Sequence, residues 1–171
     1  MCPDCLGTGA RWSMNKTHWP KLILALIVPQ CAGFIGSIFT RESVATWYQG
    51  LVKPAFSPPG WIFAPVWISL YFLMGLAFYF VLESIGDNAK RRTAVVLFCV
   101  HLAVNTAWSY LFFGLHSPFW AFIDIIVLWA MITFLIRVFW GIDRLAGAML
   151  VPYWLWVSFA GLLNYGIWMM N

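Results

Sequence analysis

The side chains of this chain that could do chemistry lie inside long apolar runs. His101, Asn105, Asp124 and Asn164 each interrupt a stretch that is otherwise apolar. An unpaired polar group is costly away from water, so such side chains normally face the interior of a helical bundle. We therefore expect them either to bind helices together through hydrogen bonds or to contact a ligand, and both readings stay open for Asn105 and Asp124.

Most catalytic arrangements are absent from the sequence. No lysine lies within an apolar run, which excludes a retinal-type Schiff base, and there is no Ser/His/Asp grouping, nucleotide-binding loop or pair of carboxylates. His101 lies one turn before Asn105 and could ligate a haem iron, but a lone histidine there is more often a hydrogen-bonded structural residue. We expect no catalytic residue and no bound cofactor; any chemistry would fall to tryptophans and a bound pigment.

The N-terminal cysteines offer an incomplete metal site. Cys2 and Cys5 lie in a stretch that looks like one copy of a chaperone-type zinc repeat. A structural zinc needs four ligands, and His18 would supply only a third. We expect no metal and interpret residues 1–19 as a disordered tail.

Five apolar runs must position these side chains. Each is about long enough for a helix to cross roughly 30 Å of hydrocarbon, and the runs are continuous, unlike the alternating strands of a barrel. They cover residues 22–39, 61–82, 93–115, 118–136 and 145–170. With 63% hydrophobic and 9% charged residues, no separate soluble domain fits. The sequence predicts an all-α membrane protein, a bundle of five transmembrane helices over 20–171.

Charge predicts the orientation of this bundle in the lipid bilayer. The net charge of +4 comes from residues at helix ends, so it indicates topology and not nucleic-acid binding. One side would hold Arg11, Lys16, Lys21, Lys90, Arg91, Arg92, Arg137 and Arg144, and the other only Arg41 and Lys53. The positive-inside rule then places the N-terminus in the cytoplasm.

The segment between the first two runs, residues 40–60, is expected to form a lid. Pro54, Pro58 and Pro59 prevent one continuous helix, and Trp47 and Tyr48 give the segment apolar surface. Such a stiff aromatic segment suits packing over one mouth of the bundle.

Small residues predict close helix contacts. Ala32/Gly36 and Gly33/Ser37 in the first run, and Ala103/Ala107 in the third, repeat at a spacing that lets another helix approach. The spacing does not decide between an internal partner and a second protomer, and we expect a homodimer that uses one of these faces.

Five local motifs together resemble the translocator protein family, also called tryptophan-rich sensory proteins or peripheral benzodiazepine receptors. They occur in the family's order over about residues 20–168. They are Trp47-Tyr48 with Lys53-Pro54 and Pro58-Pro59; Pro65-Val66-Trp67 with Leu70-Tyr71; Asn105 with Trp108 and Phe112-Phe113; Trp120-Ala121 with Asp124; and Pro152-Tyr153 with Trp156 and Leu163-Asn164-Tyr165. A bacterial member is favoured, because no Lys or Arg follows Tyr165 as in the sterol-associated pattern of animal members.

The resemblance implies five packed helices, a dimer, and a pocket for porphyrins or other flat apolar ligands beneath the first loop. The ligand-binding positions it implies are Trp67, Asn105, Trp108, Trp120, Trp156 and Ala160. The four tryptophans come from four different runs, so they can converge, and indoles offer rigid stacking area to a tetrapyrrole.

Three functions require this same pocket. We expect an integral membrane protein that binds or transports protoporphyrin-like tetrapyrroles and related apolar ligands. One alternative is an enzyme that degrades porphyrin in light, with Trp67 and Trp156 as electron or radical partners. The other is a regulatory or sensory membrane protein for which ligand binding is the input.

Overall fold

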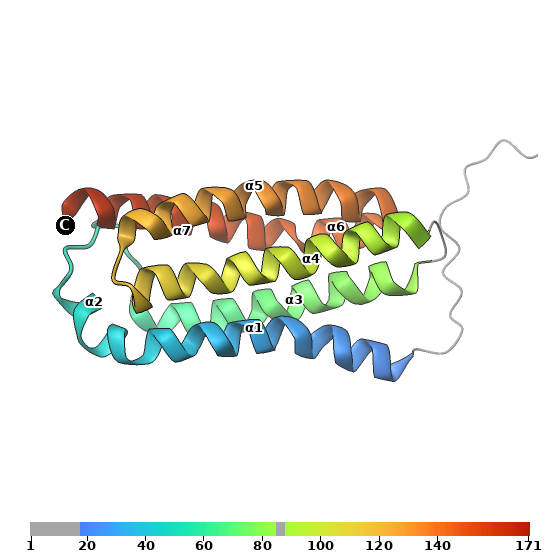
Figure 1. The fold of residues 1–171 in the computed structure, drawn as a ribbon, viewed down its shortest axis with the longest axis horizontal. Helices are drawn as coiled ribbons and strands as arrows, with labels where there is room; N and C mark the ends of the chain where they lie inside the picture. Colours follow the sequence, from blue (N-terminus) through green and yellow to red (C-terminus); the bar gives the residue numbers. More distant parts are fainter. Residues whose placement is uncertain (1–17, 85–87) are drawn as a thin grey trace, which may run out of the picture.

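The computed structural model describes residues 18–84 and 88–171, and in these segments all regular structure is helical. The long helices lie side by side in one elongated bundle (Figure 1). The elements are α1 (Trp19–Ala45), α2 (Trp47–Gly50), the 3₁₀ turn η1 (Gly60–Ile62), α3 (Phe63–Glu83), α4 (Asn88–Ser109), the π-helical turn η2 (Tyr110–Gly114), α5 (Pro118–Ile142), α6 (Arg144–Met149) and α7 (Val151–Met170).

Within residues 18–84 and 88–171, five helical segments are long and apolar enough to cross a membrane, which confirms the predicted fold class. The fifth consists of two helices, because α6 ends at Met149 and α7 begins at Val151. Pro152 lies in the first turn of α7, where its missing N–H leaves no helical bond unmade. The first helix starts at Trp19, so one residue of the predicted tail is helical, and residues 1–17 with Cys2 and Cys5 lie outside the described segments.

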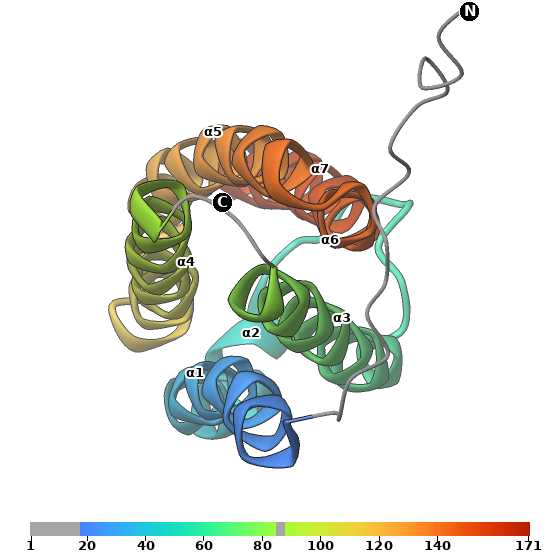
Figure 2. The same cartoon turned by 90° about the vertical axis from the view of Figure 1, so that its right-hand side faces the viewer.

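The helices form a ring when the bundle is viewed along its axis. The order around it is α1, α3, α6 with α7, α5 and α4 (Figure 2). Fully buried apolar side chains from α3, α4 and α5 fill the centre, among them Met74, Phe98 and Ile132. The rings of Phe78 and Phe98 stack at 4.3 Å and join α3 to α4.

The small residues of α1 are used inside this bundle. A Cβ atom on Gly33 would lie 2.3 Å from Cε2 of Tyr71 in α3. One on Gly36 would lie 2.9 Å from the Ser109 Oγ at the end of α4. The close approach predicted from the spacing therefore has internal partners on this helix.

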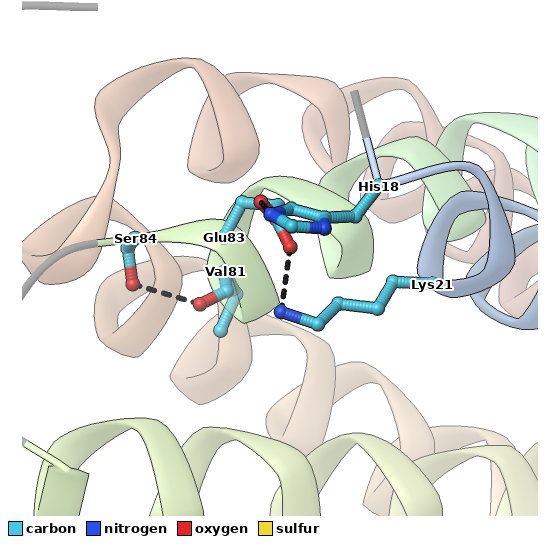
Figure 3. A network of polar contacts seen from close by, with 5 residues as sticks. All are labelled: His18, Lys21, Val81, Glu83 and Ser84. Atoms are coloured by element: carbon cyan, nitrogen blue, oxygen red, sulfur yellow. Dashed lines mark hydrogen bonds and ion pairs between the residues drawn. The ribbon is translucent and has the colours of Figure 1, made fainter. Parts of the chain in front are cut away.

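An ionic cluster closes the end of the bundle at which α1 begins. Lys21 Nζ in the first turn of α1 donates to Glu83 Oε1 at the end of α3, at 2.9 Å. His18 Nε2 lies 3.8 Å from Glu83 Oε2 (Figure 3). Because α1 and α3 are antiparallel neighbours, this contact fixes their register at the helix ends.

The predicted start of the lid was wrong. Helix α1 runs five residues past Thr40, to Ala45, and a short helix follows at Trp47–Gly50. Residues 41–45 contain neither glycine nor proline, so nothing in them breaks the helix. The segment that joins α1 to α3 is therefore residues 46–62.

Candidate functional site

A polar bridge joins three helices at the centre of the bundle. Tyr71 Oη on α3 donates to Asn105 Oδ1 on α4 at 2.7 Å, and Asn105 Nδ2 donates to Tyr153 Oη on α7 at 3.1 Å. All three side chains are buried. The single amide thus serves as both acceptor and donor for two phenols, so Asn105 links α3, α4 and α7 through hydrogen bonds.

Two of the four predicted tryptophans interleave across the interface between α3 and α7. The Trp67 ring on α3 packs 6.2 Å from Tyr153 of α7, and the Trp156 ring on α7 packs 5.9 Å from Phe63 of α3. Both indoles are half-buried, and Ala160 lies one turn beyond Trp156 against the same core. The Trp156 Nε1 donor is buried and has no hydrogen-bond partner.

Trp108 contributes from α4 and is held by Asn164 of α7. Its Nε1 donates to Asn164 Oδ1 at 3.0 Å, and Asn164 Nδ2 donates in turn to the Pro118 carbonyl at 2.8 Å. The Trp108 ring stacks 5.1 Å from Phe112. This network ties α4, α5 and α7 together beside the bridge at Asn105.

Trp120 does not join the other three tryptophans. Its neighbour Ala121 is fully buried, but Trp120 itself is 58% exposed on the outer face of α5 and packs against Phe119. Tyr71 and Tyr153 thus connect Trp67 with Asn105, and Trp108, Trp156 and Ala160 pack against the same buried core, whereas Trp120 lies apart from them on α5.

The first part of the segment joining α1 to α3 packs on η2. Trp47 stacks on the His116 ring at 4.5 Å, and Tyr48 packs against Phe113 at 5.7 Å. Burial raises the pKa of the Tyr48 phenol. Lys53 Nζ lies 4.6 Å from the centre of the Tyr48 ring, a cation–π contact.

His116 lies beneath this contact, and no sequence motif singles it out. Its φ of 51° is left-handed, which is uncommon for a residue other than glycine. Ser43 Oγ donates to the Phe113 carbonyl at 2.6 Å, so it accepts from His116 Nε2, 3.0 Å away. The imidazole therefore carries a proton on Nε2.

The second part of the segment is attached to α7. The Val52 N–H donates to Asn171 Oδ1 and Asn171 Nδ2 donates to the Val52 carbonyl, both at 3.0 Å. Pro54 is buried against Gly166, on which a Cβ atom would lie 2.5 Å from Pro54 Cγ. We call these two contacts, made by Val52, Pro54, Gly166 and Asn171, the loop clamp.

Beyond the clamp the segment is only partly covered. Phe56 contacts Phe159 of α7 at 6.3 Å, and the buried Ser57 Oγ has no hydrogen-bond partner. Pro58 is half-buried, while Pro59 and Trp61 are exposed. The segment therefore packs on the bundle through Trp47 and Tyr48 in its first part and through the loop clamp.

The two remaining ionisable candidates, His101 and Asp124, differ in their surroundings. His101 is fully buried, its Nδ1 lies 2.8 Å from the Phe98 carbonyl, and its ring packs 5.6 Å from Tyr153. This hydrogen bond agrees with the structural reading of His101. Asp124 is half-buried and its Oδ2 has no partner. In the described part of the chain no group of three metal-ligating side chains is found.

Comparison with known proteins gives a consistent result. Residues 25–169 match the model of the TspO/MBR family. The chain is 41% identical to the Tryptophan-rich protein TspO of Chlorobaculum tepidum over 92% of this chain and 99% of that protein. It is 38% identical to the Protein CrtK of Rhodobacter capsulatus, over 82% and 86% of the two chains. It is 34% identical to the Translocator protein of Bos taurus, over 90% and 91%.

Proposed function

The chain belongs to the TspO/MBR family, and from this premise we propose that it binds and carries protoporphyrin-like tetrapyrroles and related flat apolar molecules. Its five apolar helices make it an integral, multi-pass membrane protein. The ligand would lie beneath residues 46–62, among Trp67, Trp108, Trp156, Asn105 and Ala160.

The observation that carries this proposal is the interleaved pair Trp67 and Trp156. Two indoles on facing helices provide rigid apolar area of the kind that a flat ring system needs. The unpartnered Nε1 of Trp156 is a buried donor without an acceptor, and a carboxylate or carbonyl of a ligand would satisfy it. A site made only to pack helices would gain nothing from leaving that donor unpaired.

The names of the relatives support transport as part of the role. The bovine protein is called a translocator, and carriage of a ligand by this chain is our extension of that name. We also propose a homodimer, and a cytoplasmic N-terminus because Lys21, Lys90, Arg91, Arg92, Arg137 and Arg144 gather at one end of the bundle.

One experiment tests binding and separates the alternatives. Protoporphyrin is added to the purified protein in detergent, and its absorbance and the tryptophan fluorescence are followed in the dark and under illumination. We expect saturable quenching and a spectrum that stays stable in light. Loss of pigment and a new product only in light, abolished by Trp156→Phe, would favour the degrading enzyme, and absence of quenching would overturn the proposal.

A further inference from the structure

An apolar groove runs along the outer face of the bundle between α4 and α5, away from the tryptophan site. It is lined by Leu97, Ile126, Val127, Ala130, Met131 and Phe134. Five of the six lining residues lie on α5 at helical spacing, and Phe134 and Val127 are about half exposed. Such an apolar furrow between two spans opens toward the lipid.

The groove continues into a polar head at one end. Leu97 also lines a second hollow with Arg92, Thr93 and Val96, in the first turns of α4. On the antiparallel helix, Arg137 lies one turn beyond Phe134 on the same face of α5 and is exposed. The groove therefore ends between two arginines, one from each helix.

These two arginines have no counter-charge among the described residues. The ion pairs of residues 18–84 and 88–171 both involve Glu83, at the ends of α1 and α3. Asp143, near the end of α5, is used to accept the Ala146 N–H. Two like charges beside an apolar furrow are best neutralised by an anion that carries a hydrocarbon chain.

From this juxtaposition we propose that the α4/α5 groove is a binding site for an anionic phospholipid. An acyl chain lies along Leu97, Ala130 and Phe134, and the phosphate lies between Arg92 and Arg137. Basic pockets between helices on the cytoplasmic side are typical sites for acidic headgroups. A second copy of the chain fits less well, because a symmetric dimer would bring the same arginines together at the same depth.

The test uses the full chain, stripped of lipid by detergent exchange and examined by native mass spectrometry. The probes are phosphatidylglycerol and phosphatidylcholine with identical acyl chains, added at equal concentration. We expect the wild type to retain phosphatidylglycerol preferentially. Arg92→Gln and Arg137→Gln should each reduce that preference about fivefold, the effect of one basic residue near an anionic lipid. Arg41→Gln removes the same charge at the opposite end of the bundle and should leave the preference unchanged.

A variant of the apolar part separates the groove from mere surface charge. Ala130→Phe fills the furrow without altering charge, and it should weaken retention of both lipids. Equal retention of the two lipids by the wild type would overturn the proposal, as would full preference in the Arg92→Gln/Arg137→Gln variant. If Ala130→Phe changed the mass of the oligomer and left the lipid adducts unaltered, the groove would be a contact between protomers instead. None of these outcomes depends on tetrapyrrole binding.

Discussion

Three polar atoms in the spans illustrate how single residues divide between structure and function. His101 Nε2, Asp124 Oδ2 and Trp156 Nε1 are buried without a partner. Leaving a buried donor or acceptor unpaired costs on the order of 1–3 kcal/mol. Asn105 shows the opposite case, because its amide oxygen accepts from Tyr71 and its amide nitrogen donates to Tyr153. Substitution at Asn105 should therefore affect folding first, and substitution at Trp156 should affect binding first.

We expect Asn105→Leu to destabilise the fold by roughly 1–3 kcal/mol, because it strands two buried phenol hydroxyls. Thermal unfolding in detergent measures the loss. The control is Tyr71→Phe/Tyr153→Phe/Asn105→Leu, which removes the stranded groups and should regain part of the stability. If the triple variant were less stable than Asn105→Leu, the hydroxyls would have other partners.

At the proposed site, Trp67→Ala and Trp156→Ala should each weaken protoporphyrin binding by roughly 1–3 kcal/mol, because each removes a large aromatic contact. Trp120→Ala removes the same side chain from the outer face of α5 and should leave affinity unchanged. Quenching of tryptophan fluorescence gives the affinities. Wild-type affinity in folded Trp67→Ala and Trp156→Ala proteins would exclude this site.

The tryptophans show that the sequence alone does not predict which face of each helix points into the bundle. The spans are apolar on all sides, so they have little amphipathic period from which an inward face can be read. Trp120 and Ala121 are adjacent and equally compatible with lipid, yet only Ala121 is buried. Element lengths were predictable because the bilayer fixes them, whereas the rotation of each helix depends on packing such as that of Gly33 against Tyr71.

At the scale of elements, the loop clamp predicts how firmly residues 46–62 are held against the bundle, and hydrogen exchange can measure this. In Asn171→Ala the Val52 N–H loses its acceptor, so its hydrogen exchange should accelerate about tenfold, as expected for one net hydrogen bond. Asn88→Ala, at the opposite end of the bundle, is the matched control. Unchanged exchange at Val52 would mean that Pro54 and the packing of Trp47 suffice to hold the loop.

Ligand binding should act on the same element. A ligand that contacts both the loop and the bundle favours the closed loop only through its higher affinity for that state. Protoporphyrin should therefore slow exchange and proteolysis within residues 46–62 more than around Lys90–Arg92. Equal protection of the two regions would indicate entry between helices from the lipid.

The two helix faces that carry small residues have different roles. The face of α1 packs inside the bundle, and the face of α4 is the candidate dimer interface. Gly36→Leu should unfold the protein, because the added side chain meets Ser109 of α4. Ala103 is exposed on α4, so Ala103→Leu should leave the monomer folded and weaken the homodimer. Cross-linking in native membranes reports both effects. A wild type that is monomeric in membranes would contradict the dimer.

For the whole molecule, the asymmetry of charge decides which mouth faces which compartment. Among the described residues, the end that carries α2 and the loop clamp holds only Arg41 and Lys53, and the other end holds the remaining basic residues. By the positive-inside rule, the end of the bundle that carries the loop clamp faces away from the cytoplasm. The end of the α4/α5 groove that holds Arg92 and Arg137 then lies in the cytoplasmic leaflet, where it attracts anionic lipids.

Labelling of single cysteines in intact cells tests this orientation. In a background without the native cysteines, Arg41→Cys should react with a membrane-impermeant maleimide from outside, and Lys90→Cys should react only after permeabilisation. Both positions are exposed at helix ends, so they differ in side and not in accessibility within the fold. The reverse pattern would place the clamped mouth in the cytoplasm, and labelling of both sites from outside would indicate two orientations. With the expected result, a ligand entering through the loop would come from outside the cytoplasm.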